Sequence, residues 1–258
     1  MPRIIGRIVV AAVALAALLA GSAGGAVATH PTPAGMAAAR NALLRRSDVG
    51  RAWTSTPAPK TAPGLTCPAF SPALAGVVQS GAATSPTFLA TSTGPFASQT
   101  AYAYASASEE QTVWGEVARP QLLTCIAASL VRSARGGVHF VVTSKRLLTL
   151  PSLPVHAMGY RIVGTASVPN QTVNVYLDVL LLGAGTTVTE LSLSSFLQPV
   201  ASAFELRLAR IVGGRVAASC TACTGALATF RDQFADPPRP RRVGRSGRVY
   251  ASSRLGVE

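Results

Sequence analysis

The chain has 258 residues, of which 48% are hydrophobic and only 6% aromatic, so it can bury a core built mainly from small side chains. Its formal net charge is +13, yet residues 219–258 alone hold seven arginines against three acids. We find no recognisable nucleic-acid-binding module in the sequence, and we therefore expect no nucleic-acid partner.

The first 28 residues have the order of a secretory signal peptide. Arg3 and Arg7 precede an apolar run over residues 8–20, and Ala26-Val27-Ala28 offers small residues for cleavage. A membrane anchor is the alternative, but a spanning helix needs about 20 apolar residues and this run is shorter. We expect a secreted or cell-envelope protein whose mature chain begins near Thr29, with no membrane span after signal cleavage.

The next elements are a helix, a loop and two strands. Thr32 as an N-cap and Pro33 at the first helical position predict a helix that ends near the sequence LLRRSD. Recurring prolines over residues 54–72 indicate a loop, which contains Cys67. Residues 87–106 read as two strands around Gly94-Pro95, because large and small side chains alternate after the turn.

Residues 106–133 form a longer helical segment. The pairs Ser106 with Glu109 and Ser108 with Gln111 both match a capping box, which marks a helix start. Apolar residues then recur at roughly helical spacing as far as Leu130. Pro120 should kink this helix or divide it in two.

Four strands and a last helix follow. The strands are predicted over residues 138–150, 157–168, 172–182 and 186–196, and the helix over residues 199–212. In the third strand, valines and leucines share one parity, while Asn174, Tyr176 and Asp178 share the other. This pattern is typical of a half-buried antiparallel meander with one polar face. The element order predicts an α+β fold, with an antiparallel sheet and helices packed on one side.

The domain organisation follows from these elements. Residues 1–28 are the predicted signal peptide, residues 29–218 form a single folded domain, and residues 219–258 should be a disordered basic tail rich in Pro, Gly and Arg.

Several motifs together resemble the PknH-like extracellular sensor domains of actinobacteria, over residues 34–216. The matching features are ALLRRSDVGRAW, a cysteine in the next loop (Cys67), the Tyr104–Glu109 segment, Cys125 in a long helix, VNVYLDVLLLGAGTTVTELSL and FELRLARIVGGRV. The resemblance implies an exported α+β domain of sensor or lipoprotein type, with a curved sheet and a cleft for a small ligand. This chain shows no kinase domain and no lipobox cysteine, so the tethering and signalling output of the kinase relatives have no support here.

The four cysteines favour disulfides in an exported chain. Cys67 and Cys125 lie far apart in sequence, and a disulfide between them is the natural interpretation, with two free buried thiols as the alternative. Cys220 and Cys223 form a C-x-x-C that follows the last helix and has no second pair of metal ligands. We expect a local disulfide there, although four cysteines allow three connectivities. The sequence thus predicts no metal and no cofactor.

Catalytic chemistry finds little support. No G-x-S-x-G motif is present, and His139 and His156 are the only candidate bases within the fold. We therefore predict no catalytic residue and no enzyme, and an exported hydrolase is the least favoured class.

The polar sheet face is the predicted ligand site. Arg161, Asn174, Tyr176, Asp178 and Glu190 are expected to share it, with Asp178 and Glu190 facing the same side across a glycine turn. These side chains suit a small polar ligand, a cell-wall fragment or an envelope protein. We expect a non-enzymatic sensor-like domain; the alternatives are a structural or protein-interaction module, for which the face would be a plain solvated surface.

Overall fold

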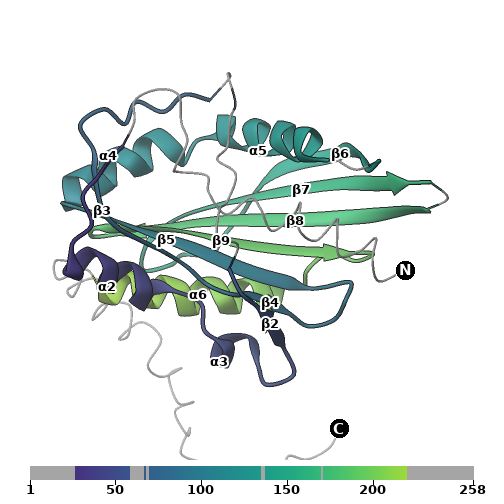
Figure 1. Cartoon of the computed structure of the whole chain (residues 1–258), viewed down its shortest axis with the longest axis horizontal. Coiled ribbons are helices and arrows are strands. Elements are labelled where there is room, and N and C mark those ends of the chain that lie inside the picture. The colour runs from purple at the N-terminus through teal and green to yellow at the C-terminus, as the bar shows by residue number, and fades with distance from the viewer. Residues whose placement is uncertain (1–26, 59–66, 68–69, 135–136, 170, 220–258) are drawn as a thin grey trace, which may run out of the picture.

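The computed structural model describes residues 27–58, 67, 70–134, 137–169 and 171–219 (Figure 1). One mixed sheet runs through the molecule. Along its main path, in spatial order, the strands are β1 (Ala28–Thr29), β3 (Val78–Thr84), β5 (Phe96–Tyr104), β9 (Thr187–Phe196), β8 (Gln171–Ala184), β7 (His156–Val168) and β6 (His139–Leu148). Two further strands, β2 (Thr54–Thr56) and β4 (Thr87–Leu89), pair with each other, and β4 also pairs with β5. The described pairs are antiparallel except β1 with β3.

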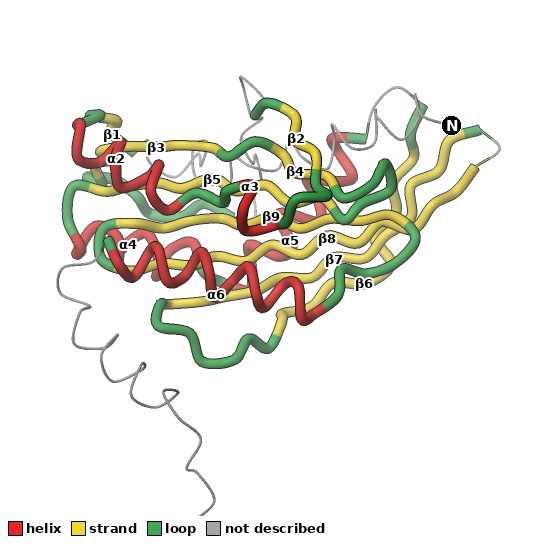
Figure 2. Tube along the Cα trace, turned by 90° about the horizontal axis from the view of Figure 1, so that it is seen from below, coloured by secondary structure: helices red, strands yellow, loops and turns green. Residues whose placement is uncertain are grey.

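Helices cover both faces of this sheet, so the prediction that they pack on one side is wrong. Helices α4 (Ala107–Val117) and α5 (Pro120–Ser133) lie on one face. Helices α2 (Pro33–Ala42), α3 (Arg46–Val49) and α6 (Ser202–Ala218) lie on the other, as Figures 1 and 2 show from two directions. The α+β class and the single domain are confirmed.

Strand β8 shows why both faces need a cover. Val179 and Leu181 belong to the core beneath α4 and α5, whereas Leu180 and Leu182 belong to the core beneath α6. All four side chains are fully buried. This part of the strand has apolar side chains on both faces, and exposing either face to water would cost free energy. A helix layer is therefore needed on each side of the sheet.

The alternation predicted for β5 is confirmed. Phe96, Tyr102 and Tyr104 pack in the core on the α4 and α5 side. The alanines of the same strand form a flat opposite face, on which α2 lies close to the backbone; they are Ala97, Ala101 and Ala103. The bulky face of β5 therefore lies on the side of α4 and α5, and its flat face packs against α2.

The predicted helix starts are also confirmed. The Gly35 N–H donates to Thr32 Oγ1 at 3.0 Å, and the Glu109 N–H donates to Ser106 Oγ at 3.2 Å. Pro120 begins α5 directly after α4 has ended, so it divides the helical segment in two. Within the described residues, no helix is long and apolar enough to cross a membrane.

Strand β3 and helix α3 were not predicted. Strand β3, with the sequence VQSGAAT, lacks an apolar alternation and pairs with β5 along one side. Helix α2 packs on β3 at two glycines, since a Cβ on Gly81 would lie 2.3 Å from the carbonyl carbon of Gly35. Only glycine allows this approach of helix and strand.

Candidate functional site

Strand register brings four side chains into one row on the sheet face against which α6 packs. Leu193, Asp178, Arg161 and Arg146 stand directly opposite one another on β9, β8, β7 and β6. Directly paired residues of antiparallel strands project from the same face of the sheet. The register therefore places Arg161 and Asp178 on one face, as predicted, and shows that they are direct neighbours. It also adds Arg146, which was not among the predicted site residues.

Arg161 and Asp178 form a bidentate ion pair that Glu205 joins. Arg161 Nε donates to Asp178 Oδ1 at 2.6 Å, and Nη2 donates to Oδ2 at 2.7 Å. The same Nη2 donates to Glu205 Oε2 at 3.2 Å, from the first turn of α6. The Asp178 side chain is fully buried, and those of Glu205 and Arg161 are 5% and 13% exposed. Two acids thus share one guanidinium between the sheet and α6.

Glu205 is the least satisfied member of this cluster. Its Oε1 is buried and has no hydrogen-bond partner among the described residues. Burial and the nearby charge of Asp178 raise the pKa of Glu205 to about 7, against the lowering effect of Arg161 and Arg146. The hydrogen bonds to Asp178 raise the pKa of Arg161, so the guanidinium stays charged. Glu205 can therefore change charge near neutral pH.

The same sheet face continues past the start of α6, where no helix of the described residues covers the strands (Figure 2). The next row across the sheet contains Ser195, Tyr176, Val163 and Ser144. Tyr176 and Val163 are half-buried, and Ser144 and Asn174 are exposed. Solvent thus reaches a polar strip that borders the buried ion cluster.

A hollow of about 430 Å³ opens at the end of this strip, between the β4–β5 connection and the start of α6. Its lining is mainly apolar and includes Phe196, Pro199 and Phe204. Ser195 also lines it and stands opposite Tyr176, so the hollow and the polar strip share a border. Leu197 at the hollow is 58% exposed and has a φ of 77°, a strained conformation for a residue with a branched side chain.

Two parts of the predicted face are wrong. Glu190 stands opposite Leu181, whereas Asp178 stands opposite Leu193, so the two carboxylates project from opposite faces of the sheet. Because of the two-residue turn between β8 and β9, each even-numbered residue of β8 stands opposite an odd-numbered residue of β9. Asp178 and Glu190 both have even numbers, so they cannot share a face. Asp178 is also buried under α6 and is not part of a solvated surface. Arg161, Asn174, Tyr176 and Asp178 do share one face, as predicted.

Glu205 belongs to this cluster but was not among the predicted site residues. In the structure it is 4% exposed and faces the sheet. The spacing of residues along α6 could have predicted that Glu205 is buried. Glu205 falls on the same 3.6-residue stripe as Leu208, Val212 and Val216, all of which are buried. A carboxylate on an apolar stripe predicts a buried partner of opposite charge.

The two described cysteines lie side by side as thiols, Cys67 half-buried and Cys125 buried. Burial, together with the adjacent Cys67, raises the pKa of Cys125 to about 12. The structure thus brings together the pair expected to form a disulfide, and the disulfide itself stays a prediction. Cys220 and Cys223 lie outside the described residues, as do most of the predicted signal peptide and the basic tail.

The histidines are placed apart from this cluster. His139 and His156 lie at the first positions of β6 and β7, and the His156 ring lies 5.5 Å from that of Trp114. Among the residues that the structure describes, no group of three or more His, Cys, Asp or Glu side chains could hold a metal ion. The prediction that the chain is not an enzyme remains a prediction.

Comparisons with known proteins add no assignment. No protein-family model matches the chain, and no curated protein matches it significantly. The resemblance to PknH-like sensor domains therefore stays a prediction.

Proposed function

We propose that this chain is an exported, non-catalytic domain of sensor type, which binds a small polar ligand of the cell envelope on the sheet face beside Arg161. The observation that carries the proposal is the buried cluster of Arg161, Asp178 and Glu205, bordered by the solvent-accessible strip and the hollow. A buried ion cluster rarely adds stability over apolar packing. A carboxyl with a strongly raised pKa near a hollow is instead typical of a binding or active site.

The side chains around the cluster favour a ligand with carboxylate, hydroxyl or amide groups. Arg161 Nη1 has no hydrogen-bond partner within the described part of the chain, and Arg146 in the same row is exposed. Guanidinium groups bind carboxylates through paired hydrogen bonds. Tyr176 and Asn174 offer a phenol and an amide, and the apolar hollow has the volume of a small-molecule pocket. Peptidoglycan fragments carry all of these ligand groups.

A small ligand suits the surface better than a protein partner does. The exposed large apolar side chains of the described residues are Val131, Val141, Leu147 and Leu197. Val131 lies on α5, and Val141 and Leu147 lie on opposite faces of β6, as their partners in β7 show. They do not form the contiguous apolar patch that marks a protein interface.

Thermal-shift screening of the exported protein tests the proposal. The probes are muramyl dipeptide, N-acetylglucosamine and diaminopimelic acid, which carry amide, hydroxyl and carboxylate groups. A ligand at a hundred times its Kd stabilises the folded state by about 2.7 kcal/mol and must raise the Tm. A rise of Tm with any of these probes is the expected result. If no wall fragment changes the Tm at millimolar concentration, the small-ligand function is wrong.

A further inference from the structure

The two helix layers of the molecule carry opposite charge balances. Residues 27–58 and 202–219, which supply α2, α3 and α6, hold seven arginines and only two acids, Asp48 and Glu205. Residues 107–133, which supply α4 and α5, hold three glutamates and two arginines. The layers lie on opposite faces of the sheet, so one side of the molecule is strongly basic (Figure 1).

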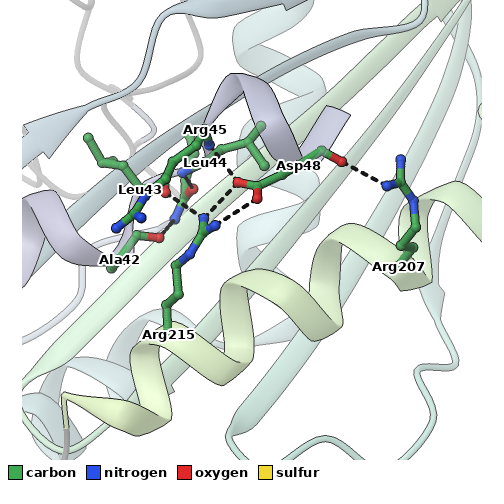
Figure 3. Close-up of polar contacts among 8 residues, drawn as sticks. Ala42, Leu43, Leu44, Arg45, Asp48, Arg207 and Arg215 are labelled. Atoms are coloured by element: carbon green, nitrogen blue, oxygen red, sulfur yellow. Dashed lines mark hydrogen bonds and ion pairs between the residues drawn. The ribbon is translucent and has the colours of Figure 1, made fainter. Parts of the chain in front are cut away.

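Both acids of the basic side are buried and already paired. Asp48 is 7% exposed and accepts from Arg215 at 2.6 and 2.7 Å (Figure 3). Glu205 is bound by Arg161 beneath α6. Neither carboxylate therefore forms an ion pair with an exposed arginine of these helices.

Six of these seven arginines are exposed. Five of them lie around α3 or on α6, and we call these five the arginine surface: Arg45, Arg46, Arg51, Arg207 and Arg210. The first three lie in and around α3, and the last two lie one turn apart on α6. Arg207 Nη1 donates to the carbonyl oxygen of Asp48 at 2.8 Å, which joins the two groups (Figure 3). No carboxylate of the described residues lies within ion-pair distance of any of the five.

Such an array of like charges repels itself unless an anionic partner neutralises it. We propose that the arginine surface docks the protein onto the anionic headgroups of a lipid membrane. Guanidinium groups bind phosphate oxygens through paired hydrogen bonds and are weakly hydrated, which suits a phosphate surface. The protein then lies on the membrane with its α3 and α6 side down, so the ligand strip beside the start of α6 is held close to the bilayer.

Two observations favour a planar membrane over a soluble polymer chain. None of the five arginines lines the hollow at residues 147–159 or the hollow at the start of α6. A polymer strand is usually tracked by a charged groove, whereas a bilayer contacts a broad surface. Residues 219–258 follow α6 directly and add seven arginines against three acids, which the same bilayer would attract.

Vesicle co-sedimentation of the exported protein tests this proposal, with phosphatidylcholine vesicles that contain or lack phosphatidylglycerol. We expect binding only to the anionic vesicles and its loss at high salt, because exposed charges are screened. A basic residue at a membrane surface contributes about fivefold in affinity. The triple variant Arg46→Gln, Arg51→Gln, Arg210→Gln should therefore lower the partition coefficient about 100-fold.

The matched control is Arg119→Gln, Arg132→Gln, Lys145→Gln, which removes the same net charge from the other side of the sheet. It should lower binding no more than about fivefold, because those residues face away from the bilayer. Unchanged Tm values would show that both variants fold. Equal binding losses in the two variants would overturn the proposal, since net charge alone would then explain them. Binding to soluble polyphosphate without binding to anionic vesicles would overturn it as well.

Discussion

The carboxylate of Asp48 accepts two hydrogen bonds from the guanidinium of Arg215, at 2.6 and 2.7 Å, and this pair joins α3 to α6 across most of the chain (Figure 3). Arg215 also donates to the Leu43 carbonyl oxygen at 2.8 Å, and Asp48 Oδ2 accepts from the Arg45 N–H at 2.6 Å. Trp53, at the end of the same segment, stacks on Phe204 of α6 with ring centroids 5.1 Å apart. The sequence ALLRRSDVGRAW thus anchors the early part of the chain on the last helix.

Removal of Arg215 should therefore destabilise the whole domain. Arg215→Met leaves Asp48 buried without its partner, and we expect a loss of about 3 kcal/mol in the free energy of unfolding. The control Arg51→Met removes an exposed arginine of the same surface and should change stability by less than about 0.5 kcal/mol. Urea unfolding monitored by Trp fluorescence measures both. Equal stability of the two variants would show that the pair does not join the helices.

The pH dependence of that pair has a definite sign. Burial alone would raise the pKa of Asp48, but the hydrogen bonds from Arg215 and Arg45 and their charges hold it below its usual value of 3.8. A lowered pKa contributes stability above the pKa of the unfolded chain, and this stability disappears as the pH falls through the folded value. We expect the stability difference between wild type and Arg215→Met to shrink below pH 4. A constant difference down to pH 2 would contradict the ion pair.

Glu110 should make the folded state less stable as the pH rises, which is the opposite of the effect of Asp48. It is 1% exposed on α4, and its Oε1 has no hydrogen-bond partner among the described residues and lies against Gly183, where a Cβ would come within 2.5 Å. Burial raises the pKa of Glu110 from 4.5 to about 7. The unfolded chain therefore ionises first, and the folded state loses up to about 3 kcal/mol as the pH rises from 4.5 to 7.

The variant Glu110→Gln tests this dependence, because it cannot ionise. It should show a smaller fall of the urea midpoint between pH 5 and pH 8 and should exceed wild type in stability at pH 8. Glu116→Gln changes a carboxylate on the same helix that pairs with Arg119 at the surface, and its slope over this range should match that of wild type. A wild-type slope in Glu110→Gln would mean that Glu110 is not buried as a carboxylic acid.

The pair Cys67 and Cys125 should form a disulfide under oxidising conditions, such as those outside the cell. The two thiols are in contact, and a disulfide would close a loop of more than fifty residues. Loop closure of this size stabilises the folded state by about 4 kcal/mol. Mass spectrometry of peptides under non-reducing conditions should find the two cysteines joined, and reductant should lower the Tm of wild type but not of Cys67→Ser. Free thiols at both positions, trapped by alkylation without reductant, would contradict the pairing.

The contact between α2 and β3 predicts a severe effect at Gly81. A methyl group there would overlap the backbone of Gly35, so Gly81→Ala must displace the helix. We expect a loss of about 3 kcal/mol, at the upper end of overpacking effects. Gly214→Ala in α6 is the matched control, since nothing lies within 4 Å of its Cβ position, and it should stabilise the helix by up to about 1 kcal/mol. Similar Tm values for the two variants would contradict the close packing.

Local sequence chemistry predicted most of the elements but not their layers. The Thr32 and Ser106 caps, the division at Pro120 and the four strands of the meander depend on neighbouring residues, and the structure has all of them. Strand β3 could not be predicted because its small and polar residues show no alternation, and its place depends on pairing with β5. Only the end of β8, which is apolar on both faces, indicated a second helix layer. The polar residues earlier in the strand suggested instead that one face is solvated.

The candidate site was predicted in part for the same reason. The alternation of β8 placed Asn174, Tyr176 and Asp178 on one face, and the register of β7 brought Arg161 to it. Glu190 was misplaced because its face depends on the length of the turn between β8 and β9. Glu205 was missed because its partner lies 44 residues away in sequence, and only the packing of α6 on the sheet brings them together.

The proposed ligand site is tested most directly by the Tm shift that a wall fragment produces in wild type and in two surface variants. Arg146→Gln and Tyr176→Phe change an exposed and a half-buried side chain of the polar strip, so their Tm values without ligand should match wild type. We predict that muramyl dipeptide raises the Tm of wild type and that each variant loses most of this rise. An equal rise in all three proteins, or no rise in wild type, would contradict binding at the face beside Arg161.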